Sequence, residues 1–496
     1  MAVICVDAGT TVIKAVGYDE TGAEAAVVRH GTSVSRPAPG HTEQDMDSVW
    51  DAVAHTVRDV AAQLGSAPDF VAVTAQGDGC WLVDASGRPT GPAILWNDGR
   101  AAATVDGWNR SGLAAEAFRV NGSSAASGLP HAILTWLNEH DPDRLARSAA
   151  NLSCGGWIFS RMTGEFAADE SDGSAPFMDL RTRAYSPALL AMFGLEWAEH
   201  LLPELRDDSR RVGGVTREAA ELLGLPAGTP VVMAPYDIAS TALGAGTVGA
   251  GQACSILGTT LCTETVIERP DLDGEPVGIT IAMPGGYLRA FPTFAGTEVL
   301  QWACRLLGLD GPAELGELAA TGPPGAGGLS FQPYFSPAGE RAPFSDPLAR
   351  GAFLGLSFEH GREHVARAVL EGLTLVIQDC LAASGDRPHE LRVCGGGSAS
   401  ALWLRMISDV TGLSVFRSGD AEVGARGAYL VGLVATGAAT GIEAAAEQHV
   451  RLRDAVRPEP GAYDTAYRDF LALRETSARS WPLLAEMRGR RKRGRA

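Results

Sequence analysis

Short apolar runs separated by small or polar residues predict several β-strands at the start of the chain. Runs at residues 3–6, 12–18 and 24–28 alternate with turn-forming residues and predict consecutive strands. Helical spacing follows at 46–64, and another strand-like run stands at 70–74. The apolar positions of the predicted helix are Val49, Val53, Val57, Val60 and Leu64. This β-then-α order indicates the layers of an α/β fold.

The second half of the chain repeats this pattern. Its predicted elements are strands at 253–257, 263–267, 278–282 and 391–393, and a long helix at 363–384. A chain of 496 residues also exceeds what one hydrophobic core usually serves. We therefore expect two large domains, residues 1–245 and 246–496, with a ligand cleft between them.

Two short segments at the ends of predicted strands combine small residues with threonines. They read Asp7-Ala8-Gly9-Thr10-Thr11 and Leu257-Gly258-Thr259-Thr260. Small residues let backbone N–H groups approach an anion closely, and threonine hydroxyls add hydrogen-bond donors. Asp7 adds a carboxylate that could hold Mg²⁺, directly or through water. Alone, such a segment is more often an ordinary hairpin turn, but one in each half predicts a duplicated ATP-binding fold.

A glycine-rich stretch is the third candidate for nucleotide contact. It reads Cys394-Gly395-Gly396-Gly397-Ser398, between a predicted strand and a helical run that begins at Ala401. Its N–H groups and bare backbone can seat a purine or a pyrophosphate, and a tight turn without a ligand is the alternative. Residues 244–249 also fit G-x-G-x-x-G, but they follow a helical run and precede a strand. That order argues against a dinucleotide-binding oxidoreductase.

Polar groups at two further strand ends suit a polyhydroxylated substrate. Asp237 follows the apolar run 230–233, where a carboxylate can accept a hydroxyl proton or can merely cap a helix. The second strand end reads Gln76-Gly77-Asp78-Gly79, and the segment Trp96-Asn97-Asp98-Gly99-Arg100 adds an indole face, an amide, a carboxylate and a guanidinium. Paired donors and acceptors beside an aromatic ring suit a polyol, and a hydrogen-bonded loop network is the alternative.

Composition narrows the environment and the partners. The net charge of −18 argues against nucleic acid as a partner, and the basic run 488–495 is expected to be a disordered terminus. No apolar stretch reaches the length of a membrane span, and no leader segment is evident, so neither a membrane nor secretion is expected. Eight scattered cysteines without a C-x-x-C pair are expected to be reduced core residues of a cytoplasmic protein.

The second half of the chain contains a block of closely spaced motifs: Pro333-Tyr334, Gly339-Glu340-Arg341-Ala342-Pro343, Asp346-Pro347 and Arg350-Gly351. Through this block the chain resembles the FGGY family of carbohydrate kinases, and the resemblance runs from about Val3 to about Gly441. The family's second signature is matched by Gly351-Ala352-Phe353-Leu354-Gly355-Leu356, then His364-Val365 and Ala368-Val369-Leu370-Glu371. The first signature is met only in part, because Ile133 stands where the family usually has lysine.

The resemblance implies an α/β fold of two ribonuclease H-like domains, as in actin, Hsp70 and sugar kinases, with an ATP and sugar cleft between the domains. It implies Asp237 as general base and Asp7 as the Mg²⁺-associated acid. The ATP-binding positions implied are Thr10, Thr11, Lys14, Gly258, Thr259, Gly396, Gly397 and Ser398. Besides Asp237, the substrate-lining positions implied are Gln76, Asp78, Asp98, Arg100 and Trp157. Family members are often homodimers, and the sequence leaves the oligomeric state open.

Substrate choice rests on few positions. Residues 92–100 look xylulokinase-like, whereas Gln76-Gly77-Asp78-Gly79 is more similar to erythritol and L-xylulose kinases. The family's glycerol kinases usually carry Arg-Glu at the positions of Gly77 and Asp78. We therefore expect phosphorylation of a terminal hydroxyl of a ketopentose such as xylulose or a tetritol such as erythritol. The alternatives are another sugar such as glycerol or ribulose, or a catalytically weak, nucleotide-gated binding protein of the actin or Hsp70 type.

Overall fold

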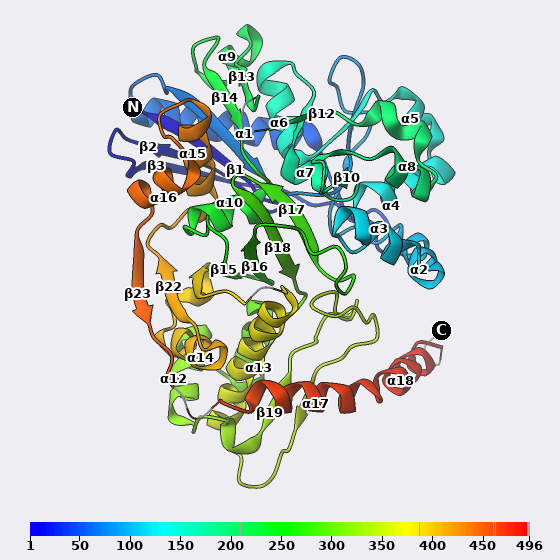
Figure 1. Cartoon of the computed structure of the whole chain (residues 1–496), viewed down its shortest axis with the longest axis vertical. Helices are drawn as coiled ribbons and strands as arrows, with labels where there is room; N and C mark the ends of the chain where they lie inside the picture. The colour runs from blue at the N-terminus through cyan, green and yellow to red at the C-terminus, as the bar shows by residue number, and fades with distance from the viewer. Residues whose placement is uncertain (208–209, 386, 460, 462, 494–496) are drawn as a thin grey trace. The chain divides into compact units, whose positions relative to one another are not determined.

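The computed structural model describes residues 1–207, 210–385, 387–459, 461 and 463–493. Internal contacts divide the chain into two compact units. Unit 1 comprises residues 1–249, 267–288 and 420–451, and unit 2 comprises 250–266, 289–419 and 452–496. Figure 1 shows the elements of both units in the order of the chain.

Unit 1 is built on a six-stranded sheet with the order β13-β14-β5-β1-β2-β3. Its strands are β1 (Val3–Ala8), β2 (Val12–Tyr18), β3 (Glu24–Gly31), β5 (Phe70–Ala75), β13 (Val212–Gly214) and β14 (Pro230–Met233). β5 runs parallel to β1 and β14, whereas β2 is antiparallel to β1 and β3, and β13 is antiparallel to β14. The strands predicted at the start of the chain and at 70–74 are thus confirmed.

Helices cover both faces of this sheet, so the side chains on both faces of its central strands are buried. Side chains alternate along β5, so Val71 and Val73 join the cluster with the helix predicted at 46–64, while Phe70 touches Gly432 of a helix on the other face. The helices of unit 1 are α1 (Met46–Leu64), α2 (Ala102–Ser111), α3 (Leu113–Asn121), α4 (Pro130–His140), α5 (Pro142–Arg147), α6 (Cys154–Thr163), α7 (Glu170–Ser174), α8 (Pro187–Phe193), α9 (Arg217–Leu223), α10 (Asp237–Gly244), α15 (Val423–Ala435) and α16 (Ile442–His449).

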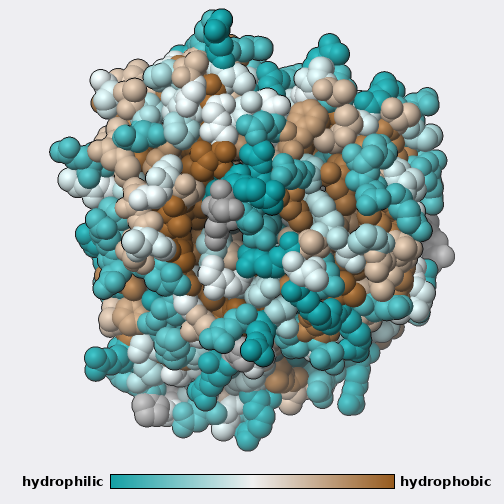
Figure 2. Space-filling view, turned by 45° about the horizontal axis from the view of Figure 1, so that its top comes forward, coloured by the Kyte–Doolittle hydropathy of each residue, from teal (hydrophilic) through white to brown (hydrophobic). Residues whose placement is uncertain are grey.

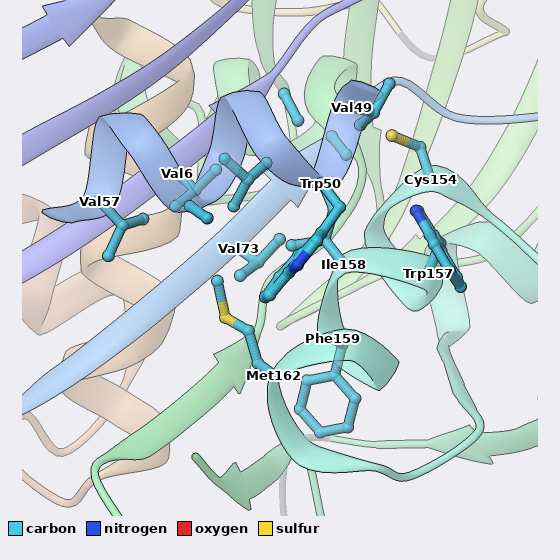
Figure 3. Packing of buried hydrophobic residues seen from close by; sticks show 14 of the residues in the cluster. Val6, Val49, Trp50, Val57, Val73, Cys154, Trp157, Ile158, Phe159 and Met162 are labelled. Carbon is cyan, nitrogen blue, oxygen red and sulfur yellow. The ribbon is translucent and has the colours of Figure 1, made fainter. Parts of the chain in front are cut away.

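The first core of unit 1 lies between the sheet and α1 with α6. Figure 3 shows Trp50 of α1, Val73 of β5 and Met162 of α6 packed close together. Asp45 caps α1 by accepting from the Ser48 N–H, and Gly65 ends it with φ 67°. Each large side chain buried here contributes about 2 kcal/mol of hydrophobic stabilisation.

Short strand pairs and one further strand complete unit 1. They are β4 (Glu43–Gln44) with β7 (Ala93–Ile94), β6 (Trp81–Val83) with β8 (Ala150–Leu152), β9 (Ala167–Asp169) with β12 (Glu204–Arg206), β10 (Met178–Asp179) with β11 (Ala184–Tyr185), and the strand β17 (Ile279–Met283). β17 is attached to α7, because the Ala282 N–H donates to Ser174 Oγ at 2.8 Å.

Unit 2 repeats the strand pattern of unit 1 in the order β18-β16-β15-β21-β22-β23. Its strands are β15 (Gln252–Leu257), β16 (Leu261–Ile267), β18 (Gly286–Pro292), β19 (Ser330–Gln332), β20 (Ala352–Leu354), β21 (Glu390–Cys394), β22 (Ser414–Ser418) and β23 (Leu452–Val456). β15 pairs antiparallel with β16 and parallel with β21, as β1 pairs with β2 and β5. The duplication expected from the sequence is therefore present in the topology.

The helices of unit 2 are α11 (Thr297–Leu307), α12 (Pro312–Thr321), α13 (Arg362–Ala383), α14 (Ala401–Thr411), α17 (Ala466–Ala478) and α18 (Trp481–Arg493). The helix predicted at 363–384 is α13. The expectation of a disordered basic terminus is wrong for 488–493, which continue α18, and residues 494–496 lie outside the described part.

The surface and the cysteines follow the composition. The face drawn in Figure 2 mixes hydrophilic residues with smaller hydrophobic groups, as is usual for a globular protein. All eight cysteines are free and buried, which confirms that they are core residues. Among the described residues, no helix is long and apolar enough to cross a membrane.

Candidate active site

The carboxyl ends of three parallel strands bring the candidate residues of unit 1 together. β14, β5 and β1 lie side by side, and backbone hydrogen bonds extend the pairing past their ends. The Gln76 N–H donates to Ala8 O at 2.9 Å, and the Ala234 N–H donates to Val73 O at 2.9 Å. Ligands of open α/β sheets bind at such strand ends. Asp7, Gln76 and Asp237, predicted separately from the sequence, therefore share one edge of the sheet.

Asp237 is the first residue of α10 and is half-buried. Burial, and after it the negative charge of Asp7, raise the pKa of its carboxyl group to about 7 in spite of the Ile238 N–H, which lowers it. A general base works best when its pKa lies near the operating pH. Tyr236 and not Asp237 occupies the N-cap position of α10, and the role of Asp237 in proton abstraction stays a prediction.

Lys14 lies between two carboxylates. Its Nζ is 3.4 Å from Asp7 Oδ2 and 3.0 Å from Glu422 Oε2, and the other oxygen of Glu422 pairs with Arg29. Burial lowers the pKa of the Lys14 ammonium, but the two carboxylates outweigh it and the pKa is raised overall. Lys14 is therefore a fixed cation beside the first turn.

Glu422 reaches Lys14 because α15 crosses the site closely. A Cβ at Gly424 would lie 3.1 Å from Asp7 Oδ2, and a Cβ at Gly427 would lie 1.8 Å from Ser240 O of α10. Only glycine leaves room for these approaches. The crossing brings the N-terminus of α15 to the edge of the sheet that carries Asp7 and Asp237.

A closed ring of hydrogen bonds fixes the turn between β1 and β2. The indole N–H of Trp96 donates to Thr10 Oγ1 at 3.1 Å, and that hydroxyl donates to Gln76 Oε1 at 2.7 Å. Gln76 Nε2 donates to Gln44 Oε1 at 2.9 Å, and Gln44 Nε2 returns to Thr10 O at 3.1 Å. The Thr10 and Gln76 side chains thus hold each other, and the neighbouring Thr11 is exposed.

Asp78 stands on a strained backbone next to this ring. It has a φ of 57°, which is uncommon for a residue other than glycine. A Cβ at Gly77 would lie 2.5 Å from the ring of Tyr236, so this position has room only for glycine. The negative charge of Asp78 also contributes to the raised pKa of Asp237. Asp78 is therefore close to the candidate base.

Asp98 and Arg100 bind mainly to each other and to nearby backbone. Asp98 Oδ1 accepts from Arg100 Nε at 2.9 Å, and Asp98 Oδ2 accepts from the Thr42 N–H at 2.5 Å. Arg100 Nη2 also donates to Glu43 Oε1 at 2.7 Å, and the Arg100 side chain is only 3% exposed. These contacts support the loop-network alternative for both residues.

Trp157 and Ile133 lie in apolar cores. The Trp157 indole packs in the first core of unit 1 (Figure 3), and its N–H donates to Met46 O at 3.4 Å. Ile133 is fully buried with Cys80, Leu82 and Leu134. The structure therefore gives Trp157 a packing role, and it places an apolar side chain in an apolar cluster at the position where lysine is usual.

The residues of unit 2 that are candidates for nucleotide binding also lie together, at the carboxyl ends of two parallel strands. β15 and β21 are parallel neighbours, and Gly258 and Gly395 follow their ends. A Cβ at Gly395 would lie 2.9 Å from Leu257 O, and Gly395 has a φ of 82°. Ser398 Oγ donates back to Gly395 O at 2.7 Å, and a Cβ at Gly396 would meet nothing within 4 Å. Gly396 thus leaves bare backbone, as a nucleotide seat requires.

Sequence reasoning missed several polar residues at or near these sites. Gln44 and Glu422 complete the two networks of the first turn, and Asn151 and Asp172 line a cavity beside Asp78. Asp172 follows Asp169 in a helical turn and could be flagged only as one acid among many. Glu422 gives no signal until the packing of α15 is known.

Comparison with protein families gives matches over both halves of the chain. Residues 2–244 match the N-terminal domain of the FGGY family of carbohydrate kinases, and residues 253–436 match the C-terminal domain of that family.

Individual relatives match over most of their length. The chain is 36% identical over 459 residues to the erythritol kinase of Brucella abortus (strain 2308), covering 88% of each chain. It is 31% identical to the xylulose kinase of Escherichia coli (strain K12), over 84% of this chain and 86% of that one. The crystal structure of xylulose kinase from Rhodospirillum rubrum superposes with a TM-score of 0.88 at 28% identity, covering 97% of this chain and 100% of that chain.

With two domains matched in order and a relative 36% identical over most of the chain, this protein belongs to the FGGY family of carbohydrate kinases, which use ATP to phosphorylate sugars.

Proposed function

We propose that this kinase phosphorylates a terminal hydroxyl of a four- or five-carbon polyol or open-chain ketose, with Asp237 as general base. The observation that carries the proposal is the Asp237 carboxyl group, whose pKa is raised to about 7. The carboxylate of Asp78 lies close enough to contribute to this rise. The carboxylate of Asp78 can accept hydrogen bonds from two hydroxyls of a linear substrate. Relatives named erythritol kinase and xylulose kinase support substrates of this size.

In the proposed reaction, Asp237 takes the proton of the substrate's terminal hydroxyl while the oxygen of that hydroxyl attacks the γ-phosphorus of ATP. The new O–P bond forms as the bond to the β-phosphate oxygen breaks, and ADP leaves. Such phosphoryl transfer depends on positioning and on charge neutralisation more than on covalent chemistry. Lys14, held between Asp7 and Glu422, supplies a fixed positive charge beside the turn. The ring through Gln76 keeps that turn in place.

Each unit carries residues that we propose as ATP contacts. In unit 1 the proposed contacts are Thr10, Thr11 and Lys14, with backbone N–H groups serving at Thr10 because its hydroxyl is engaged. In unit 2 the proposed contacts are Gly258, Thr259, Gly396, Gly397 and Ser398. Bare backbone at Gly396 supports a seat for adenosine or pyrophosphate.

Asp7 is the residue proposed to hold Mg²⁺. Burial raises the pKa of its carboxyl group although Lys14 lowers it, so the site favours additional positive charge. Among the described residues, no group of three His, Cys, Asp or Glu side chains could hold a metal, and Mg²⁺ bound to nucleotide needs only one or two carboxylates. The residues fit this ion, which would neutralise phosphate charge when bound.

The free, buried state of the cysteines supports a cytoplasmic location, where thiols stay reduced. A homodimer stays a prediction from the family.

A substrate such as glycerol or ribulose is the second candidate, and small Gly77 in place of the arginine usual in glycerol kinases makes glycerol the weaker of the two. A nucleotide-gated binding protein without turnover is not favoured, because the chain belongs to a family of kinases.

The test is ADP release with Mg²⁺ and ATP over a panel of erythritol, xylitol, D- and L-xylulose, D- and L-ribulose, and glycerol. We expect turnover with one or two members and a loss of about 1,000-fold in kcat for Asp237→Asn, since a general base typically contributes 100- to 10,000-fold. The matched control is Asp106→Asn, at an exposed position of α2, which should retain activity. Absence of turnover above the Asp237→Asn background with every member would overturn the small-polyol assignment.

A further inference from the structure

Residues 234–236 connect β14 to α10 and lead directly into Asp237, the proposed base. Tyr236 occupies the N-cap position of α10, and Asp237 follows as the first residue of the helix. Because the connection is only three residues long, a shift of its backbone also shifts Asp237. The position of Asp237 therefore depends on the contacts that hold these three residues.

Two buried hydroxyls hold the middle of this connection. Thr74 Oγ1 of β5 donates to Pro235 O at 2.7 Å, and Ser240 Oγ of α10 donates to the same oxygen at 2.6 Å. Both of these residues are fully buried. The Ala234 N–H donates to Val73 O of β5 as well. The middle of the connection is thus tied to β5 and to the helix that it precedes.

The end of the connection is held from a different element. Ser171 Oγ of α7 accepts from the Tyr236 N–H at 3.0 Å and donates to Asp169 Oδ1 at 2.5 Å. A hydroxyl has a single proton, so the bond to Asp169 commits that proton and leaves the oxygen to accept from Tyr236. Asp169 thereby orients the Ser171 hydroxyl as an acceptor for the N–H immediately before Asp237.

Asp169 is fixed in turn by a buried ion pair. Arg211 Nη1 lies 2.7 Å from Asp169 Oδ2, and both side chains are only 2% exposed. The same nitrogen donates to Met233 O, at the end of β14, at 2.7 Å. Asp169 also caps α7 by accepting from the Ser171 N–H at 2.8 Å. Arg211 and Ser171 therefore bind the backbone on either side of the connection, and Asp169 joins them.

A general base must lie within hydrogen-bond reach of the proton that it takes, and a misplacement of about 1 Å can cost about 100-fold in rate. We propose that Ser171, oriented by Asp169, is a positioning residue that holds Asp237 where it can take the proton of the substrate hydroxyl. The inference rests on the proposed function, because Ser171 acts through Asp237. The alternative is that the hydrogen bonds of Ser171 serve only the stability of the fold.

The experiment is a double-mutant cycle of Ser171→Ala and Asp237→Asn, with ADP release from Mg²⁺ and ATP measured at saturating polyol. In the enzyme that retains Asp237, Ser171→Ala should lower kcat by about 30-fold, because the base is displaced. In the Asp237→Asn background, it should lower kcat by less than about threefold, because the group that it displaces no longer acts as a base. A loss of folded protein would lower kcat by the same factor in both backgrounds.

Ser174→Ala is the matched control. Ser174 lies in the same helix and is fully buried, and its hydroxyl also both donates and accepts, to Glu170 O at 2.6 Å and from the Ala282 N–H at 2.8 Å. Because these bonds join α7 to itself and to β17, the variant should change kcat by less than about threefold. If Ser171→Ala does not fold, as judged by thermal melting, Ser171→Cys replaces it in the cycle, since a thiol is only a weak donor and acceptor.

The cycle tests the positioning role separately from the proposed function. A loss for Ser171→Ala that disappears in the Asp237→Asn background supports the positioning role. Equal losses in both backgrounds, no loss at all, or a loss as large in Ser174→Ala would overturn that role alone, while Asp237→Asn itself remains impaired. If Asp237→Asn keeps the activity of the wild type, or if the wild type phosphorylates no polyol, the proposed function itself fails.

Discussion

The ammonium group of Lys14 lies 3.0 Å from Glu422 Oε2, so a residue at the N-terminus of α15 controls a cation on β2. The Glu422 side chain is 6% exposed and divides its two oxygens between Lys14 and Arg29. An ion pair with one buried partner is screened less than a surface pair. Glu422 therefore sets the position of Lys14 relative to Asp7 without itself standing in the proposed reaction.

We predict that Glu422→Gln lowers kcat/KM for ATP by about tenfold, because a displaced cation stabilises the transferring phosphate less well. Lys14→Met should cost about 100-fold, since it removes the charge itself. Steady-state kinetics with varied ATP and saturating polyol measure both losses. The KM for the polyol should stay close to wild type in Glu422→Gln.

Arg29→Ala is the matched control, because Arg29 contacts the other oxygen of Glu422 and is about half exposed. It should change kcat/KM for ATP by less than about threefold, as expected for an exposed ion-pair partner. Equal losses in Glu422→Gln and Arg29→Ala would contradict a specific role of the Lys14 contact.

The pH dependence follows from Asp237. Burial and then the charge of Asp7 raise the pKa of its carboxyl group from 3.8 to about 7. A general base must be ionised, so kcat/KM for the polyol should rise with pH up to about 7 and then level off. The free enzyme's profile, measured from pH 5 to 8.5, tests this. A kcat/KM that is already constant at pH 5.5 would show that Asp237 is ionised there and is not the group whose ionisation makes kcat/KM rise with pH.

The raised pKa of Asp237 also makes the stability of the protein depend on pH. Activity is expected to rise with pH, whereas this contribution to stability falls. The folded state binds the proton of Asp237 more tightly than the unfolded state, so its ionisation costs stability as the pH rises from about 4 to about 7. Asp237→Asn cannot ionise, so its melting temperature relative to wild type should be higher at pH 8 than at pH 4. A difference that does not vary with pH would argue that the Asp237 pKa is unshifted.

Local sequence patterns were sufficient to predict the strands whose ends carry Asp7, Gln76 and Asp237. Apolar runs located β1, β2, β5 and β14, and strand ends located Asp7, Gln76 and Asp237. Parallel pairing then brings such ends to one edge, which is a general property of these sheets. The sequence can therefore place a site residue wherever that residue comes directly after a predicted strand.

Long-range packing explains what the sequence did not reveal. Residues 420–451 pack in unit 1, and nothing in the local pattern around Glu422 indicates that it will face Lys14. Asp98 and Arg100 have the residue types of a polyol site, but their charges are satisfied by each other. Residue type alone cannot show whether a polar group is available to a ligand, since its partners are chosen by the fold.

Asp98→Ala should therefore act on stability. Its loss leaves the guanidinium of Arg100, 3% exposed, with Glu43 as its remaining acidic partner, which should cost about 3 kcal/mol. Urea denaturation measures the change, and Asp106→Ala on the exposed face of α2 serves as control. A wild-type stability together with a raised KM for the polyol would instead support substrate contact by Asp98.

The crossing of α10 and α15 gives the last prediction. A Cβ at Gly427 would lie 1.8 Å from the backbone oxygen of Ser240, so Gly427→Ala must push the two helices apart. Overpacking of this kind costs about 1–3 kcal/mol. Since α10 begins with Asp237 and α15 follows Glu422, the displacement should also lower kcat.

Gly107→Ala in α2 is the opposite control, because a Cβ there would meet nothing within 4 Å. It should stabilise the protein by about 0.5–1 kcal/mol, since alanine favours a helix more than glycine does. Thermal melting and kcat of both variants, measured side by side, separate the steric effect from the helical preference. If Gly427→Ala were as stable and active as wild type, the close approach of α15 would not be what positions Glu422 and Asp237.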